Sequence, residues 1–268
     1  MQALEKTLME MFNHLFMSHP NITPIILELA RKSLGINEIT CYELYKFFCE
    51  NKSGIEIGGP SPIFNNQLPL YSVIRELDCV NFSNDTVWEG RLTTGADFII
   101  NGKKLGQQFI ANANNLNFIA SDNYDFLLSS NCLEHIANPL SAIAEWKRVL
   151  KPYGCLVLVL PNKISNFDHR RNVTSFEHLL EDYSSNVTDY DLTHLPEILE
   201  LHDLNLDPAA GTLEEFKIRS SSNFMNRCLH HHVFDTTLTH KILNYFDFQI
   251  VNSLETFTDF YFLAVKRI

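Results

Sequence analysis

The sequence has fewer basic residues than acidic ones: 21 lysines and arginines and 32 aspartates and glutamates give a formal net charge of −11. A chain this acidic is poorly suited to bulk binding of nucleic acid or of an anionic membrane. Long apolar runs are also missing: the longest, Cys155–Leu160, has the length of a strand and is too short to span a bilayer. The first residues show no signal-peptide pattern, and the six cysteines include no Cys-x-x-Cys pair. We therefore expect a cytoplasmic protein with reduced thiols that binds neither nucleic acid nor membrane.

Three signatures of other enzyme classes are absent. The glycine turn at residues 58–62 has prolines where Gly-x-Gly-x-x-Gly begins a helix, which leaves a NAD-dependent oxidoreductase as a minor alternative. The Ser129-Ser130 pair is not set in a Gly-x-Ser-x-Gly turn, so we expect no serine nucleophile. The histidines and acids match no compact zinc-binding spacing, and we expect no metal.

Apolar patterning indicates an α/β domain. The segments Asp125–Ser130 and Cys155–Pro161 are apolar throughout, as are strands buried on both faces of a parallel sheet. Between them, Pro139–Leu150 carries apolar residues on one helical face, which completes a βαβ unit. Further expected elements are the strands Gly54–Ile57, Cys79–Phe82 and Phe109–Ala113, the helix Thr236–Phe246, and a hairpin of Phe248–Leu254 with Phe260–Lys266. The hairpin would add a mixed edge to the sheet.

Two further regions flank or interrupt this pattern. Residues 1–50 have apolar residues at helical spacing, broken at Pro20 and Pro24, and predict a helical N-terminal layer. Residues 162–235 are rich in His, Asp, Asn, Ser and Arg, and are too long for a simple loop. They predict a helical insertion over the site, within a single domain of residues 1–268.

Three segments in this order resemble the class I S-adenosylmethionine-dependent methyltransferases, in particular a bacterial group with a Leu-Glu-His segment. They are Glu56–Pro60, Tyr124–His135 and Trp146–Gly154. Their order and spacing over about a hundred residues make the combination more specific than any one glycine turn. The resemblance implies a Rossmann-like, seven-stranded sheet, mostly parallel with one antiparallel strand, and S-adenosyl-L-methionine as cofactor.

The resemblance also implies which residues bind the methyl donor. It places the donor at the carboxyl ends of the first strands, where open α/β sheets bind their ligands. In this family an acid often binds the ribose and an aspartate often lies beside adenine. This sequence has Asn81 at the first of these places and Asn112 at the second. The donor-binding residues that it implies are Glu56, Gly58, Gly59, Ser61, Asn81, Asn112, Ala113, Ser130 and Asn131.

The insertion supplies candidates for the acceptor side. Methyl transfer to a hydroxyl requires removal of a proton, and a histidine beside a carboxylate is a suitable base near neutral pH. We predict His169 as the base, with Asp168 and His231 as further catalytic residues. Arg170, Arg171 and Arg227 either are solvated charges or form a pocket for a phosphate or carboxylate. If the nucleophile is a phosphoryl oxygen, methyl transfer needs no base. The predicted substrate-binding residues are Arg170, Arg171, Arg227, His135 and His230.

These observations favour O-methylation of a small polar or anionic acceptor. The segments Phe167–Arg171, Phe176–Tyr183 and Asn226–Phe234 resemble a subgroup found with bacterial surface-polysaccharide genes. That resemblance implies a sugar-like or phosphoryl acceptor. A sugar-amine N-methyltransferase and a non-catalytic module that binds S-adenosylmethionine stay open as alternatives.

Overall fold

The computed structural model describes residues 42–267. Contacts divide the chain into a unit of residues 1–44 and a unit of residues 45–268, and the account below concerns the second. The predicted N-terminal layer lies outside the described residues except for helix α3 (Tyr42–Cys49), which buries Tyr45, Phe48 and Cys49. Within residues 42–267, no helix combines the length and apolarity needed to cross a membrane.

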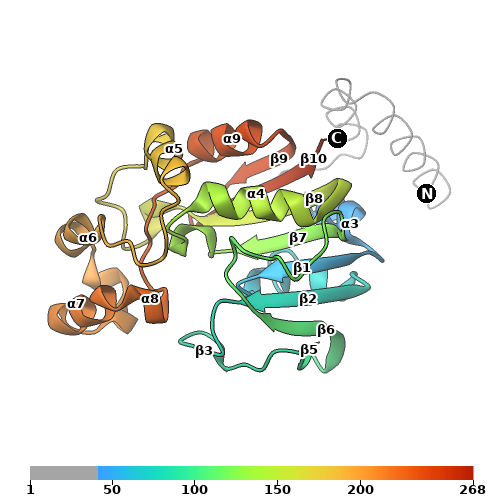
Figure 1. Cartoon of the computed structure of the whole chain (residues 1–268), viewed down its shortest axis with the longest axis horizontal. Helices are drawn as coiled ribbons and strands as arrows, with labels where there is room; N and C mark the ends of the chain where they lie inside the picture. Colours follow the sequence, from blue (N-terminus) through green and yellow to red (C-terminus); the bar gives the residue numbers. More distant parts are fainter. Residues whose placement is uncertain (1–41, 268) are drawn as a thin grey trace. The chain divides into compact units, whose positions relative to one another are not determined.

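An eight-stranded sheet forms the centre of this unit, in the order β5-β6-β2-β1-β7-β8-β10-β9 (Figure 1). The strands are β1 (Ser53–Ile57), β2 (Glu76–Asn81), β5 (Asp97–Ile100), β6 (Lys103–Ile110), β7 (Tyr124–Ser130), β8 (Leu150–Pro161), β9 (Phe248–Glu255) and β10 (Asp259–Lys266). Strands β6, β2, β1, β7 and β8 pair in parallel, and β10 lies antiparallel between β8 and β9. The mostly parallel, Rossmann-like α/β sheet is thereby confirmed, but it has eight strands rather than seven, and β5 is a second antiparallel strand in addition to β10.

Strand β5 is an eighth strand that the sequence reasoning did not include. It pairs antiparallel with β6 through a turn at Asn101 and Gly102, which have φ values of 50° and 76°. Two successive positive φ values suit a two-residue hairpin, and Asn-Gly is its preferred sequence. The same region holds a second difference: β6 ends at Ile110, so most of the predicted strand Phe109–Ala113 is a loop.

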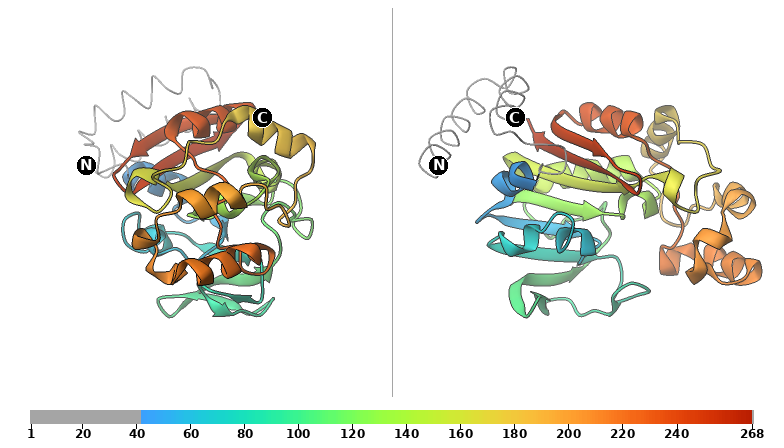
Figure 2. Two further views of the ribbon diagram at one scale, coloured as in Figure 1. Left: turned by 90° about the vertical axis from the view of Figure 1, so that its left-hand side faces the viewer. Right: turned by 180° about the vertical axis from the view of Figure 1, so that it is seen from behind.

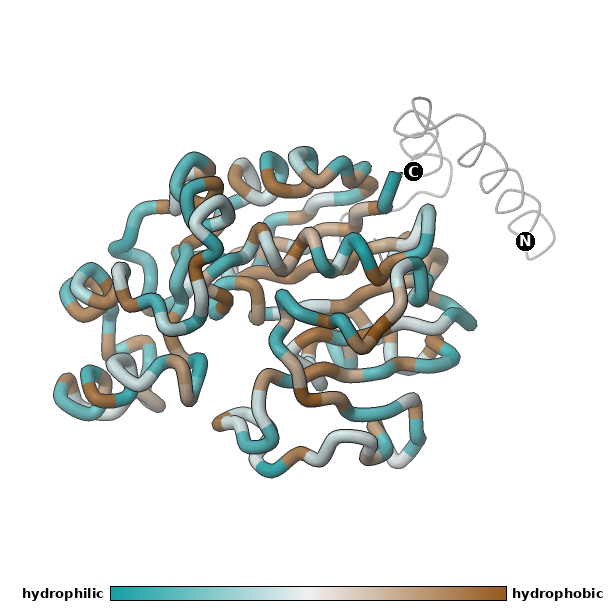
Figure 3. The backbone as a smooth tube through the Cα atoms, viewed as in Figure 1, coloured by the Kyte–Doolittle hydropathy of each residue, from teal (hydrophilic) through white to brown (hydrophobic). Residues whose placement is uncertain are grey.

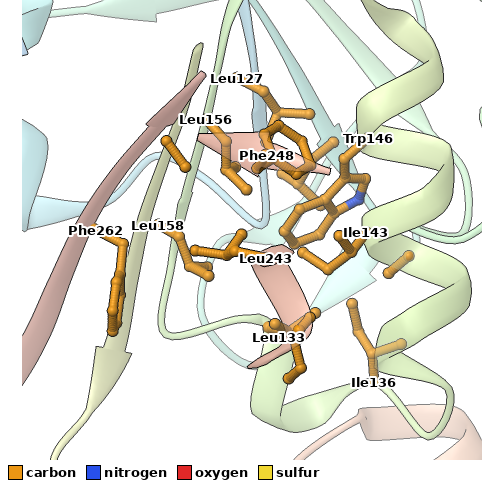
Figure 4. Packing of buried hydrophobic residues seen from close by; sticks show 14 of the residues in the cluster. Leu127, Leu133, Ile136, Ile143, Trp146, Leu156, Leu158, Leu243, Phe248 and Phe262 are labelled. Carbon is orange, nitrogen blue, oxygen red and sulfur yellow. The ribbon is translucent and has the colours of Figure 1, made fainter. Parts of the chain in front are cut away.

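The hydrophobic core joins the sheet to a layer of helices on one of its faces. This layer contains α4 (Pro139–Val149), α5 (Phe176–Ser184) and α9 (Thr236–Tyr245), with α5 contacting both of the others. Figure 3 shows the central strands as largely hydrophobic, in keeping with their burial between neighbours. Trp146 of α4 is fully buried beside Leu243 and Phe248 (Figure 4). Its indole Nε1 donates to the carbonyl of Ala113 at 2.9 Å, which ties this core to the loop after β6.

Residues 162–235 lie between β8 and α9 and contain α5 and three further helices, α6 (Leu195–Leu201), α7 (Leu213–Ser221) and α8 (Asn223–Asn226). Figures 1 and 2 show these three beyond the carboxyl ends of the parallel strands. A small apolar cluster that includes Ile198, Phe216 and Leu229 gives this segment a core of its own. The short hairpin of β3 (Asp85–Thr86) and β4 (Gly90–Arg91) follows β2.

Candidate active site

The turn after β1 requires glycine at two positions. Gly58 has a φ of 81°, and a Cβ there would lie 2.8 Å from Sγ of Cys132. A Cβ on Gly59 would overlap with the carboxyl group of Glu56. The backbone of the turn therefore passes close to β1 and to the end of β7, with no side chain between them and the space beyond.

Glu56 stabilises this turn through hydrogen bonds. Its Oε1 accepts from the backbone N–H of Ser61 at 3.0 Å, and its two carboxylate oxygens lie 2.9 and 2.8 Å from the Tyr71 hydroxyl. The side chain is fully buried, and burial raises the pKa of Glu56 to about 8 despite the opposing effect of these hydrogen bonds. This geometry supports a role for Glu56 in holding the turn in place.

A cavity of about 580 Å³ opens at the carboxyl ends of β1, β2 and β7. This is the size range of small-molecule sites. Seven of the nine residues predicted to bind the donor line it; of the two that do not, Gly59 is part of the turn and Glu56 packs against Gly59. The seven are Gly58, Ser61, Asn81, Asn112, Ala113, Ser130 and Asn131.

Several features of the lining fit S-adenosylmethionine. The Ser130 hydroxyl is buried and has no hydrogen-bond partner among residues 42–267, so it is available to a ligand. Asn81 donates through Nδ2 to the carbonyl of Gly59 at 2.8 Å, which leaves its Oδ1 as an acceptor for a ribose hydroxyl. Between β1 and β2 the chain forms only two short 3-10 helices, at Pro62–Phe64 and Leu70–Ser72. No α-helix therefore begins at this turn to bind a dinucleotide pyrophosphate.

Another part of the cavity lining contains a histidine paired with a carboxylate. Nδ1 of His230 lies 2.5 Å from Oδ2 of Asp168, and Nη1 of Arg171 donates to the other carboxylate oxygen at 3.0 Å. Burial would raise the pKa of Asp168, but His230 and Arg171 outweigh it and lower the pKa to about 2. Burial disfavours the charged form of His230, yet the Asp168 carboxylate prevails and raises the pKa of this imidazole. Of these three residues, only His230 lines the cavity.

Glu134 and His135 adjoin His230 in the lining. Oε1 of Glu134 lies 4.0 Å from Nε2 of His230, and neither carboxylate oxygen has a hydrogen-bond partner. Burial raises the pKa of Glu134 to about 7, although His230 opposes this. Burial lowers the pKa of His135, whose Nδ1 lies 3.1 Å from the carbonyl of Leu229. Glu134, His135 and His230 each offer a ligand atom within 4.8 Å of the others, so a metal is geometrically possible here.

The other predicted catalytic residues do not line the cavity. Nε2 of His169 lies 3.0 Å from Asp203, which also accepts from Arg170, and this group belongs to a different part of the insertion. His231 is buried with Nε2 2.9 Å from the side-chain nitrogen of Asn223, and burial lowers its pKa to about 4. The carboxylate partner that the sequence assigned to His169 belongs instead to His230.

The predicted anion-binding arginines are all engaged within the protein. Arg171 is 2% exposed and donates to the carbonyls of His230 and His231 at 2.8 and 3.0 Å, so it fixes the backbone of this segment. Arg227 lines the cavity, but it forms an ion pair with the buried Asp189. Its Nη2 also donates to Oδ1 of Asn112 at 3.1 Å, which joins the insertion to the loop after β6.

The sequence reasoning missed several residues of the lining. Trp88 and Glu89, from the β3–β4 hairpin, lie across the cavity from the turn, and the Trp88 ring is 5.3 Å from that of His135. Phe167 places its ring 4.6 Å from His230. Glu134 belongs to the Leu-Glu-His segment, but the sequence alone did not indicate that its carboxyl group lines the cavity.

Comparison with known proteins matches part of the chain to a family model, and the chain is similar to several solved structures. Residues 93–158 match a family model described as a methyltransferase domain, which supports an S-adenosylmethionine-dependent methyltransferase. A methyltransferase of Aquifex aeolicus is similar in structure at 13% identity, with a TM-score of 0.46 over 91% of this chain and 98% of that one. One from Methanosarcina mazei is similar at 15% identity, with a TM-score of 0.45 over 84% and 97%. No curated protein matches the sequence.

Proposed function

We propose that this protein is an S-adenosylmethionine-dependent O-methyltransferase in which His230 removes the proton of the acceptor hydroxyl. The observation that carries the proposal is the position of the Asp168–His230 pair, because His230 lines the same cavity as the turn after β1. A donor-binding turn and a histidine with a carboxylate partner thus share one enclosed space. S-adenosylmethionine supplies an electrophilic methyl group to such a site.

The carboxylate of Asp168 sets the protonation of His230. A carboxylate 2.5 Å from Nδ1 keeps the proton on that nitrogen, so Nε2 carries the lone pair that accepts the substrate proton. Asp168 also stabilises the imidazolium that forms, and Arg171 holds Asp168 in place. The Asp168 carboxylate raises the pKa of His230, which makes this imidazole a stronger base.

The rings around His230 exclude water from this part of the cavity. Phe167 and His135 each lie with ring centroids 4.6 Å from that of His230, and Trp88 packs against His135. The Glu134 carboxyl, whose pKa burial raises to about 7, lies 4.0 Å from Nε2 of His230, beyond direct hydrogen-bonding distance. His230 therefore holds the proton taken from the acceptor as an imidazolium paired with Asp168.

The acceptor is proposed to be a small polar molecule of the sugar class, as in surface-polysaccharide biosynthesis. The polar side chains of Asn166 and Glu134 line the cavity together with His230. They can bind hydroxyl groups, whereas the paired Arg227 offers less to a free phosphate. A neutral or amino sugar unit fits this lining better than a phosphoryl nucleophile.

Two measurements test the proposal in sequence. Calorimetry should show binding of S-adenosylmethionine, and no binding would contradict the donor assignment. Incubation with sugar nucleotides, sugar acids and amino sugars should release S-adenosylhomocysteine with at least one class. Tight donor binding without turnover on any class would instead support a non-catalytic binding module.

A further inference from the structure

A second group of histidines lies in the insertion, outside the cavity lining. It combines His178 and Asp182 of α5 with His194, which directly precedes α6, and His232, from the segment leading to α9. His178 and Asp182 are four residues apart and therefore lie on the same side of the helix. Each of the four side chains offers one ligand atom, and these atoms all lie within 4.8 Å of one another.

We propose that His178, Asp182, His194 and His232 bind one Zn²⁺ ion that holds the insertion together. In a tetrahedral site with bonds of about 2.05 Å, neighbouring ligand atoms are about 3.3 Å apart. Here Nε2 of His178 lies 2.9 Å from Nε2 of His194 and 3.3 Å from Oδ2 of Asp182. Nε2 of His232 lies 3.7 Å from the same Asp182 oxygen. These three distances bracket the tetrahedral value.

Hydrogen bonding alone satisfies this cluster poorly. The single Nε2 position of His178 faces both the His194 nitrogen and the Asp182 carboxylate, and one proton cannot serve both well. Oδ2 of Asp182 is buried without a hydrogen-bond partner in a residue that is 9% exposed. Nε2 of His232 lies 3.0 Å from the carbonyl of Ala137, a contact that metal binding would replace. A cation among these atoms would compensate the buried carboxylate.

The ligand types favour zinc over the harder cations. Three imidazoles and one carboxylate suit Zn²⁺, whereas Mg²⁺ and Ca²⁺ prefer oxygen ligands. The Glu197 carboxylate lies 3.8 Å from Nδ1 of His194, where a metal-bound imidazole commonly finds its partner. With four protein ligands, the site would be closed and structural.

The ion would connect parts of the chain that also shape the cavity. His232 is two residues from His230, and Asn138, which caps α4, donates to the carbonyl of Asp182 at 3.1 Å. His178 is about one-third exposed, so an ion can enter from that side. Compact motif spacing could not reveal the site, because its ligands are spread from residue 178 to residue 232.

Metal analysis of tag-free, full-length protein tests the proposal. After incubation with ZnCl₂ and exhaustive dialysis, mass spectrometry should find about one zinc per chain. Replacement with Co²⁺ should give the intense visible absorption of a tetrahedral centre. Chelation should lower the melting temperature, and zinc should restore it. Wild-type protein that retains no zinc would overturn the proposal.

Variants locate the ion. His178→Gln and His194→Gln should each reduce bound zinc at least fivefold while circular dichroism shows a folded chain. His169→Gln, a histidine outside the cluster, should keep the full stoichiometry. Glu134→Gln separates this site from the three potential ligands in the cavity: retention of zinc is expected. Loss of zinc in Glu134→Gln with retention in His178→Gln would place the ion in the cavity and refute the proposed site.

Discussion

The imidazole of His230 lies 2.5 Å from the carboxylate of Asp168, across 62 residues of sequence. The arginine three residues after Asp168 holds the other oxygen of that carboxylate, and also donates to the backbone of His230 and His231. Arg171 thus fixes both members of the pair. In a buried environment such a group is sensitive to any change that leaves one charge unpaired.

Replacing His230 with glutamine should remove the base without removing the donor site. We expect kcat to fall by roughly 10²- to 10⁴-fold, the usual contribution of general acid–base catalysis, while the Kd for S-adenosylhomocysteine changes little. Steady-state kinetics and calorimetry measure the two quantities. The matched control is His169→Gln, which alters a histidine bound to Asp203 away from the cavity and should leave kcat near the wild-type value. The reverse result would restore His169 as the base.

The contact of Arg227 with Asn112 should contribute to donor binding, because it holds the loop after β6 against the insertion. Asn112→Ala removes the oxygen that accepts from Nη2 of Arg227. A hydrogen bond to a charged group contributes about 1.5 kcal/mol, so the Kd for the donor should rise roughly tenfold. Asn112→Asp keeps an acceptor for the arginine and should bind the donor nearly as well as wild type. Equal weakening in both variants would mean that Asn112 acts on the ligand directly.

Much of the fold follows from local patterns. Strands β7 and β8 are apolar because each lies inside the sheet between two neighbouring strands, and α4 carries one apolar face toward them. The position of the cavity was also predictable, because carboxyl ends of parallel strands meet at one edge. Seven of nine predicted donor-binding residues lie there for this reason.

The acceptor side was harder to predict, because the direction of a side chain in an irregular segment depends on partners that are far away in the sequence. Asp168 and His169 are neighbours in sequence, yet one faces His230 and the other faces Asp203. Likewise, His230, His231 and His232 each bond to a different partner. Neither periodicity nor spacing encodes these directions. Composition located the segment but could not say which of its histidines lines the cavity.

Glu56 should make stability fall as pH rises. Its pKa is 4.5 in its ordinary state and about 8 when folded, so the neutral acid is favoured by the fold. The stabilisation that comes from keeping this carboxyl neutral is fully present below pH 4.5. It is lost progressively as the pH rises to about 8, and the total loss in unfolding free energy is roughly 5 kcal/mol. In Glu56→Gln, which cannot ionise, this component should be absent. Urea unfolding of both proteins at pH 5, 6.5 and 8 measures their unfolding free energies. If the difference in unfolding free energy between wild type and variant stays constant with pH, the raised pKa of Glu56 is contradicted.

Gly59 should tolerate no side chain while Glu56 lies beneath it. Gly59 does not need a positive φ, so Gly59→Ala tests only the overlap of the new methyl group with the Glu56 carboxyl. Overpacking of this kind typically costs about 1–3 kcal/mol, and displacement of the turn should also weaken donor binding. Gly95→Ala is the control, because Gly95 has a φ of 81° but open space around it. This variant should lose only the stability that backbone strain costs, and it should bind the donor as wild type does. Combining Gly59→Ala with Glu56→Ala should recover part of the loss, since the colliding group is gone. Strict additivity of the two substitutions in unfolding free energy would show that Glu56 does not limit the turn.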